Sequence, residues 1–165
     1  MKIEKTLLEN VLLIKPDIFE DHRGQFIEIY NKKEFKKNGI DTDFVQDDIS
    51  TAAKNILKGI HGDFVTKKFI SCLYGKLYFV ILDYRKESKS FGAWQSFILS
   101  DRNRHQILIP PGFGNGFLSL EDNSIFSYKQ STYYDRSKQF TVKWDDERFN
   151  IFWPCDKPIL SLRDS

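Results

Sequence analysis

The chain has 165 residues, a formal net charge of +2, and 41% hydrophobic, 29% charged and 15% aromatic residues. This length predicts one domain over residues 1–165 with a core of its own. The small net charge argues against a protein that binds nucleic acid through a strong positive field. Residues 1–17 place charges inside a short apolar run, so neither a signal peptide nor a membrane anchor is expected there. Cys72 and Cys155 match no zinc spacing and allow one disulfide, although reduced thiols in a cytoplasmic protein are the simpler interpretation.

Short apolar runs and two-residue alternation dominate the chain, a pattern typical of β-strands. Strands are expected over residues 10–16, 24–30, 43–48, 67–85, 94–100, 105–111, 116–121, 124–132 and 140–146. One helix is expected over residues 31–39, closed by Gly39, and Gly75 predicts a hairpin turn. Turn residues recur at roughly ten-residue intervals, which predicts an all-β jelly-roll barrel. An N-terminal strand arm and short helical or irregular segments complete it, and Pro-rich residues 153–165 are expected to fold back over the body.

Three histidines are candidates for a general base. His22 and His105 stand among charged residues and are expected at the surface. His61 differs, because the "KGIHGD" stretch delivers it from a strand into a glycine-flanked turn. That position alone suits a structural histidine as well as a catalytic one. A neutral imidazole is nevertheless the usual group for removing a carbon-bound proton near neutral pH.

A metal site is disfavoured by the absence of histidine pairs. Jelly-roll barrels that hold iron, zinc or manganese typically offer two or three histidines and a carboxylate. Here the early turn offers only His61, and "PPGFGN" places Asn115 where many metal-binding cupins have their last histidine. Two or more imidazoles are missing, so the sequence predicts a barrel without a metal.

Basic and phenolic side chains are candidates for substrate contacts. The basic residues of two turn-bounded stretches are Arg23, Lys58, Lys67 and Lys68. Such residues suit phosphate groups, although solvated surface charge is the ordinary interpretation of them. Tyrosines in the "FSYKQSTYYD" stretch are ordinarily core residues, yet a phenol that faces a pocket is a competent proton donor.

The chain carries eight ordered motifs that resemble those of a known enzyme family. They are "EDHRGQFIE", "FVQDDIS", "LKGIHGD", "LDYRKESKSFG", "LSDRNRHQILIPPGFGNGF", "YKQSTYY", "VKWDDE" and "IFWPCDKPILSLRD". In this order they resemble the nucleotide-sugar 3,5-epimerases similar to dTDP-4-dehydrorhamnose 3,5-epimerase. A closer resemblance is to the GDP-4-keto-heptose epimerases of bacterial capsule synthesis. It rests on "GIHGD" followed by "TKK", together with "GFGN". The resemblance implies a cupin-type jelly roll, a homodimer that exchanges N-terminal strands, no cofactor, and a nucleoside-diphosphate 4-keto sugar as substrate.

The same resemblance implies roles for individual residues. His61 becomes the base, and Asp164 becomes the carboxylate that orients its ring. Lys68 becomes the cation near the C4 oxygen, and Tyr128 becomes the proton donor. The residues implied to line the sugar or nucleotide pocket are Arg23, Glu28, Gln46, Asp48, Lys58 and Tyr134, with Asn115 as a neutral hydrogen-bonding group facing the sugar. These types suit the chemistry, because a base, a cation and an acid on the opposite face are what epimerisation next to a ketone needs.

Departures from the family pattern leave the substrate open. Asn115 replaces the histidine of "GFAHGF", Asp48 replaces an asparagine, and Lys58 replaces an arginine. The leading hypothesis is a GDP-4-keto-heptose epimerase that acts at C3, or at C3 and C5. The second is a dTDP-4-keto-6-deoxyhexose 3,5-epimerase, and the third is a non-catalytic sugar-binding jelly roll. The presence of the full catalytic set disfavours the binding module, and the missing ligands disfavour a metal-dependent cupin.

Overall fold

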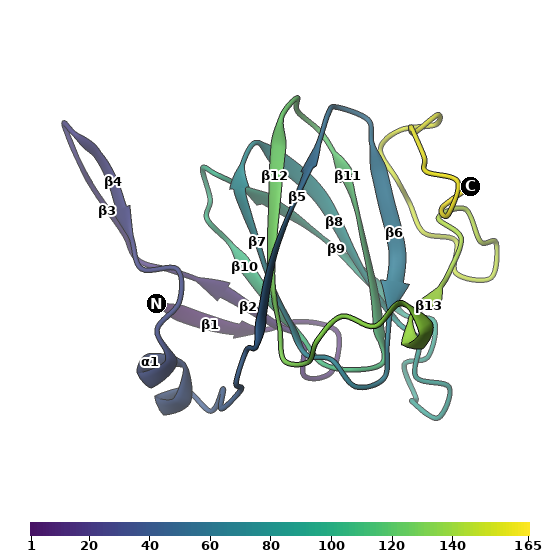
Figure 1. Cartoon of the computed structure of the whole chain (residues 1–165), viewed down its shortest axis with the longest axis horizontal. Helices are drawn as coiled ribbons and strands as arrows, with labels where there is room; N and C mark the ends of the chain where they lie inside the picture. The colour runs from purple at the N-terminus through teal and green to yellow at the C-terminus, as the bar shows by residue number, and fades with distance from the viewer.

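The computed structural model describes residues 1–165 and shows two facing β-sheets with a hairpin projecting from one side (Figure 1). The six-stranded sheet has the order β1 (Lys2–Lys5), β2 (Leu12–Lys15), β10 (Gln106–Ile109), β7 (Lys68–Tyr74), β12 (Ser124–Gln130), β5 (Gln46–Ala52). The five-stranded sheet has the order β13 (Phe140–Thr141), β6 (Leu57–Gly62), β11 (Phe113–Ser119), β8 (Lys76–Asp83), β9 (Trp94–Ser100). The projecting hairpin pairs β3 (Ile18–Asp21) with β4 (Gly24–Ile27). The predicted all-β jelly roll with an N-terminal arm is confirmed.

The predicted helix is also confirmed, as α1 (Lys32–Lys37). Asn31 caps it, since its side chain accepts from the backbone N–H groups of Lys33 and Glu34. Phe35 is the buried residue of this short helix, and its ring packs edge-on against that of Phe69 of β7, with ring centroids 5.2 Å apart. A single 3₁₀ turn, η1 (Arg136–Lys138), lies between β12 and β13. Neither helix has the length and apolar character needed to cross a bilayer.

The predicted hairpin at Gly75 is wrong, although the turn itself is present. β7 pairs with β10 and β12, whereas β8 pairs with β11 and β9, so the two strands belong to different sheets. Gly75 has a φ of 77°, and a Cβ there would lie 2.5 Å from Ser124 Oγ, which explains the glycine. The sequence could not separate the two arrangements, because most of both strands is buried and a continuous apolar run does not show which sheet it joins.

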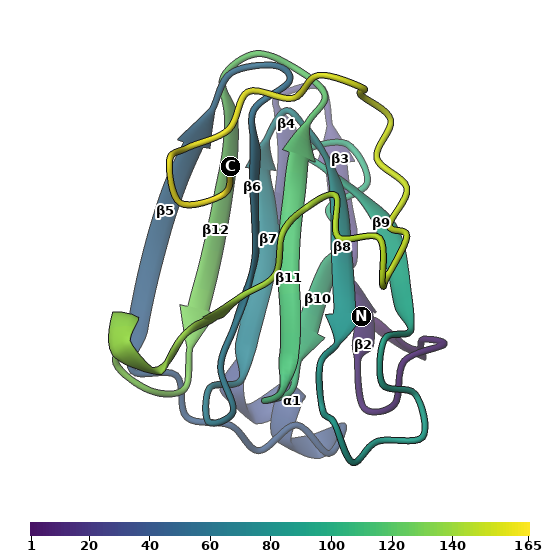
Figure 2. The same ribbon diagram turned by 90° about the vertical axis from the view of Figure 1, so that its right-hand side faces the viewer.

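The main core lies between the two sheets. Phe117 of β11 stacks on Phe126 of β12 with ring centroids 4.8 Å apart, so the two sheets meet directly. A second cluster covers the outer face of the five-stranded sheet, where Trp153 packs with Val80 and Leu82. Figure 2 shows the C-terminal segment, in yellow, running over this sheet. The fold-back predicted for residues 153–165 is therefore observed, and it brings the end of the chain to the mouth of the barrel.

Candidate active site

A cavity of about 340 Å³ opens between the two sheets next to the C-terminal segment. This volume lies in the range of small-molecule sites. Its lining residues are Ser50, Lys58, Gly59, His61, Lys68, Ile70, Asn115, Phe117, Phe126, Tyr128, Gln130, Tyr134, Gln139, Ser161, Arg163 and Asp164. Most of them are polar or charged, so the cavity suits a ligand with many hydrogen-bonding groups.

His61 and Asp164 form a pair in this wall. His61 Nε2 lies 2.6 Å from Asp164 Oδ1, and Ser161 Oγ donates to Asp164 Oδ2 at 2.9 Å. Burial by itself raises the pKa of the Asp164 carboxyl, but the hydrogen bonds to His61 and Ser161 outweigh it and hold that pKa below its ordinary value. An ionised carboxylate only accepts hydrogen bonds, so Nε2 of His61 carries the ring proton. Nδ1 is then left with a free lone pair, which is the form a general base requires.

Lys68 is the first residue of β7 and reaches the same cavity. Its Nζ donates to Asn115 Oδ1 at 3.5 Å, which is a weak contact. Burial lowers the pKa of Lys68, while the charge of Asp63 opposes this shift and the charge of Arg163 adds to it. A poorly solvated cation gains more than an exposed one from an oxygen that develops negative charge. Lys68 is therefore placed to stabilise such an oxygen.

The glycine-rich stretch sets Asn115 beside His61. The two residues are directly opposite in the pairing of β11 with β6. A Cβ at Gly114 would lie 2.5 Å from Ile60 Cγ2, and one at Gly116 would lie 2.9 Å from Lys58 O. Because only glycine lets the strands approach this closely, the flanking glycines fix the position of the Asn115 amide in the cavity wall.

Tyr128 approaches the cavity from the opposite sheet, on β12. Asp48 of β5 is its direct cross-strand neighbour. Burial raises the pKa of Tyr128, and the charge of Asp48 raises it further, so the phenol keeps its proton at neutral pH. Asp48 is itself held by two amides, since Gln46 Nε2 and Gln130 Nε2 each donate to Oδ2 at 2.8 Å.

Comparisons with known proteins identify the family. Residues 5–165 match the family model described as dTDP-4-dehydrorhamnose 3,5-epimerase. The protein of that name from Salmonella typhimurium is 39% identical, with 100% of this chain and 93% of the relative covered. The chain belongs to the dTDP-4-dehydrorhamnose 3,5-epimerase family. It is accordingly an isomerase, as predicted.

Solved structures of similar epimerases agree with this assignment. The enzyme from Bacillus anthracis, with TDP and PPi bound, has a TM-score of 0.95 and 38% identity, covering 99% of this chain and 95% of that one. The enzyme from Legionella pneumophila, in complex with dTDP-4-keto-L-rhamnose, has a TM-score of 0.94 and 35% identity, covering 99% and 89%. These relatives carry dTDP-sugar names, so the expected closer likeness to GDP-4-keto-heptose epimerases is not supported by them.

The structure of this epimerase brings most of the predicted site residues together. Those that line the cavity are His61, Lys68, Tyr128, Asp164, Lys58, Asn115 and Tyr134. Gln46 and Asp48 lie just behind the lining, because Gln46 Oε1 accepts from the Tyr134 backbone N–H at 2.8 Å. Lys58 Nζ donates to Ser50 Oγ at 2.8 Å, which holds this cation at the edge of the cavity.

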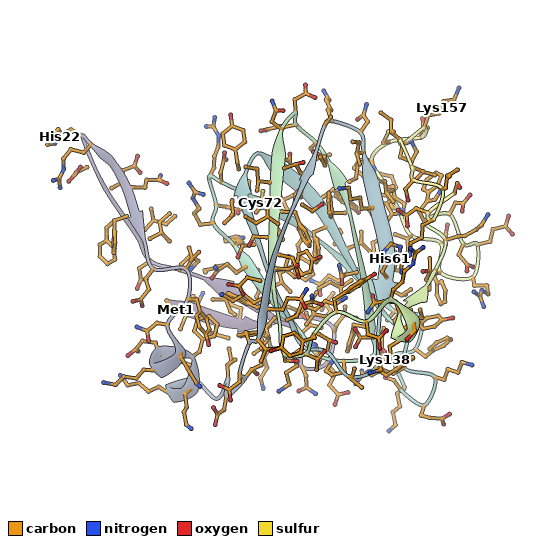
Figure 3. All side chains as sticks on the ribbon, in the orientation of Figure 1. Met1, His22, His61, Cys72, Lys138 and Lys157 are labelled. Carbon is orange, nitrogen blue, oxygen red and sulfur yellow. The ribbon has the colours of Figure 1, made fainter.

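Arg23 and Glu28 are not brought to the cavity of their own chain. Both belong to the arm around β3 and β4, where Arg23 Nη2 donates to Asp21 Oδ2 at 2.6 Å and Glu28 accepts from Asn31 Nδ2 at 3.0 Å. Figure 3 shows His22 at the tip of this arm and His61 on the distant side of the barrel. The structure therefore shows no contact of these two residues with the cavity of the same chain.

Nine lining residues were not predicted, and the five of them with polar or charged side chains are Ser50, Gln130, Gln139, Ser161 and Arg163. Ser161 and Arg163 belong to the "LSLRD" motif that supplied Asp164, so the motif itself contained that information. Gln139 follows η1 and no sequence pattern marks it. The structure shows no group of three or more His, Cys, Asp or Glu side chains arranged for a metal ion, and catalysis without a metal stays a prediction.

Proposed function

We propose that this chain is a cofactor-independent epimerase that inverts C3, or C3 and C5, of a dTDP-linked 4-keto-6-deoxyhexose. The observation that carries the proposal is one cavity holding a His61–Asp164 pair, a half-buried Lys68 and a protonated Tyr128. The dTDP-sugar names of the relatives favour this substrate over a GDP-linked heptose. Residues 1–165 act as one domain in this proposal, without a metal.

The reaction begins with proton removal next to the ketone. The C4 carbonyl acidifies the hydrogens on C3 and C5, because the resulting carbanion delocalises onto oxygen. His61 Nδ1 takes the proton, and Asp164 stabilises the imidazolium that forms. Lys68 donates to the enolate oxygen as its charge develops. No electron leaves the substrate, so the step needs no redox partner.

Inversion follows from the placement of the acid and the base on different sheets. His61 lies on β6 of the five-stranded sheet, whereas Tyr128 lies on β12 of the six-stranded sheet. A sugar ring bound between them exposes one face to each group. Tyr128 delivers its proton to the face opposite the one from which His61 removed it. Solvent then reprotonates the phenolate and accepts the proton of the imidazolium, which completes the cycle.

The same cavity offers cations for the diphosphate. Lys58 and Arg163 line it together with the catalytic residues. Arg163 Nη1 lies 3.5 Å from the Tyr134 hydroxyl, and its guanidinium forms no ion pair within the chain. An arginine without a carboxylate partner suits a bidentate phosphate contact. We assign the diphosphate to this edge of the cavity.

We infer that the working form is a homodimer with exchanged arms. Phe19 and Phe26 lie directly opposite each other on the arm and are 63% and 70% exposed. A two-stranded hairpin is marginal on its own, and two exposed aromatic rings favour burial against a partner. A second copy that covers this arm would also receive Arg23 and Glu28 at its own cavity, which gives these predicted binding residues a function.

A GDP-linked 4-keto-heptose is the second candidate. Asn115, Asp48 and Lys58 replace the histidine, asparagine and arginine of the family pattern, and all three lie at or next to the cavity. Such replacements alter the hydrogen bonds offered to the sugar and the nucleotide without touching the His61–Asp164 pair.

The test is to incubate the exhaustively chelated protein with dTDP-4-keto-6-deoxyglucose and with a GDP-4-keto-heptose in deuterium oxide. NMR reads the label and configuration at C3 and C5. We expect inversion and deuterium at C3, or at both carbons, of the dTDP sugar. Turnover of the GDP sugar alone would select the second candidate, and binding without exchange would show a sugar-binding module. Activity that returns only on adding a metal would contradict the cofactor-independent mechanism.

A further inference from the structure

Asp63 is a buried carboxylate beside the cavity whose charge acts on Lys68 but whose hydrogen bonds the proposed mechanism does not use. It follows β6 directly and is 4% exposed. Its Oδ1 accepts the backbone N–H groups of Val65 at 2.9 Å and Thr66 at 2.6 Å. Its Oδ2 accepts from Gln139 Nε2 at 2.7 Å. Every hydrogen bond of this carboxylate is therefore with an N–H donor, and one of those donors belongs to a residue of the cavity wall.

The backbone places Gln139 opposite Asp63. β13 pairs with β6 so that Phe140 is opposite Gly62 and Thr141 is opposite His61, and one step further along this register sets Gln139 against Asp63. The strands are held closely there, since a Cβ at Gly62 would lie 2.4 Å from Phe140 Cζ. Gln139 is therefore a fixed part of the cavity wall. It lies two residues before Thr141, the cross-strand neighbour of His61.

The hydrogen bond also fixes which end of the amide faces inward. A carboxylate that accepts three N–H groups offers only acceptors, so the Gln139 amide must turn its nitrogen to Asp63. Its Oε1 is then the free end of the side chain, and no donor of the chain bonds to it. An acceptor in a cavity wall needs a donor, and the hydroxyl groups of a sugar are donors.

We propose that Asp63 and Gln139 form a specificity-determining pair, in which Asp63 holds the Gln139 amide so that its Oε1 accepts a hydrogen bond from a sugar hydroxyl. The inference rests on the proposed function, because it takes the sugar to lie over His61. Asp63 is a positioning residue in this pair, since it touches the substrate only through Gln139. The pair selects sugars with a free hydroxyl at this wall over deoxy or keto analogues, which leave Oε1 without a donor. The pair also presents a neutral amide to an anionic substrate, because the negative charge of Asp63 lies behind the Gln139 side chain.

Asp63→Asn reverses the hydrogen-bonding character of the cavity wall at Gln139 and preserves the turn that Asp63 forms with Val65 and Thr66. The new amide keeps an oxygen for Val65 and Thr66 and turns its NH₂ group to Gln139. Gln139 must then rotate its own amide, so that Nε2 faces the sugar in place of Oε1. We expect the dissociation constant of dTDP-glucose, measured by calorimetry, to rise about tenfold or more. The dissociation constant of TDP alone should stay unchanged, because it lacks the sugar.

A second substitution should restore the binding. In Asp63→Asn with Gln139→Glu, the Asn NH₂ donates to one carboxylate oxygen and the other again accepts from the sugar. We expect dTDP-glucose affinity to return to within about threefold of the parent chain. Gln139→Glu alone sets two carboxylates in contact and should lose sugar affinity. A residue with a merely structural function would not show this reciprocal rescue.

Asp101→Asn is the matched control, since Asp101 also accepts a backbone N–H, from Gly75 at 3.0 Å, and does not line the cavity. It should bind both ligands as the parent does. The inference is overturned if folded Asp63→Asn binds dTDP-glucose normally, if the double variant is no better than the single one, or if the sugar adds no affinity in the parent chain. Failure of the proposed function is separate, and would appear as absent deuterium exchange in the parent chain whatever these affinities are.

Discussion

The reactivity of His61 depends on a balance at Asp164. Burial opposes ionisation of this carboxyl, and its hydrogen bonds to His61 and Ser161 favour ionisation more strongly. Because the folded pKa of Asp164 lies below its unfolded value, its interactions contribute stability at neutral pH, and this contribution is lost as the pH falls through the lowered pKa. The pair is thus intact over the pH range in which a neutral imidazole can act as a base.

Tyr128 offers a way to separate deprotonation from inversion. Tyr128→Phe removes the hydroxyl with little change in volume, so packing against Phe126 should persist. Proton removal needs only His61 and Lys68, and exchange of substrate hydrogen with solvent should therefore continue. Delivery to the opposite face should fall by about 10²–10⁴-fold. NMR of one sample in deuterium oxide gives both the label and the configuration.

The opposite result for Tyr128 is equally clear. A tyrosine that serves only as a core aromatic would cost about 1 kcal/mol or less of unfolding free energy on conversion to Phe. Epimerisation at the full rate by Tyr128→Phe would therefore rule out its assignment as the proton donor.

At the scale of single elements, glycine residues caused most of the errors in the predicted strand bounds and strand pairing. The sequence predicts a strand over residues 116–121, whereas β11 spans Phe113–Ser119. The prediction ends one strand at residue 111 and begins the next at 116, whereas Gly114 lies within β11 and, with Gly116, permits the close approach of β11 to β6. The same ambiguity produced the wrong hairpin at Gly75. Short elements without alternation, such as β1 and β3, gave no usable pattern. The residues of β7, β8 and β9 were correctly predicted as strand, although the pairing of β7 with β8 was not correct.

The arm is the element with the most direct prediction for assembly. Phe19→Ser together with Phe26→Ser removes the exposed rings that we assign to the dimer contact. We expect this variant to sediment as a monomer and to lose most activity, because Arg23 and Glu28 no longer reach a partner cavity. Leu7→Ser is the control, since Leu7 is 87% exposed and lies outside the arm. A double variant that remains dimeric, or a parent chain that is monomeric, would contradict the exchanged-arm dimer.

On the scale of the whole molecule, the cavity is assembled from distant parts of the chain. His61 and Asp164 are 103 residues apart in sequence and 2.6 Å apart in space. Composition and periodicity predict the jelly roll, but they do not predict the contact between His61 and Asp164. The family motifs did so, because "LKGIHGD" carries His61 and "IFWPCDKPILSLRD" carries Asp164. The Asp63–Gln139 pair was missed for the converse reason, since only the pairing of β13 with β6 brings the two residues together.

The identity of the substrate could not be read from the sequence with the same success. A few residues, "GIHGD" followed by "TKK" and the "GFGN" stretch, suggested a GDP-linked heptose, whereas the relatives are dTDP-sugar enzymes. The reaction depends on groups whose type is dictated by the chemistry. The choice of sugar and nucleotide depends on small differences in hydrogen bonding across a whole cavity, which single positions do not determine.

The assignment of His61 as the base is tested by the rate of deuterium incorporation into dTDP-4-keto-6-deoxyglucose by His61→Asn. The variant keeps a polar side chain in the wall but has no basic nitrogen. We expect no incorporation at C3 or C5, together with a cooperative thermal transition, lowered only by the loss of the His61–Asp164 contact, and unchanged affinity for TDP. His105→Asn, which alters a histidine away from the cavity, should exchange at the parent rate. Incorporation by folded His61→Asn at a rate near that of the parent chain would contradict the account.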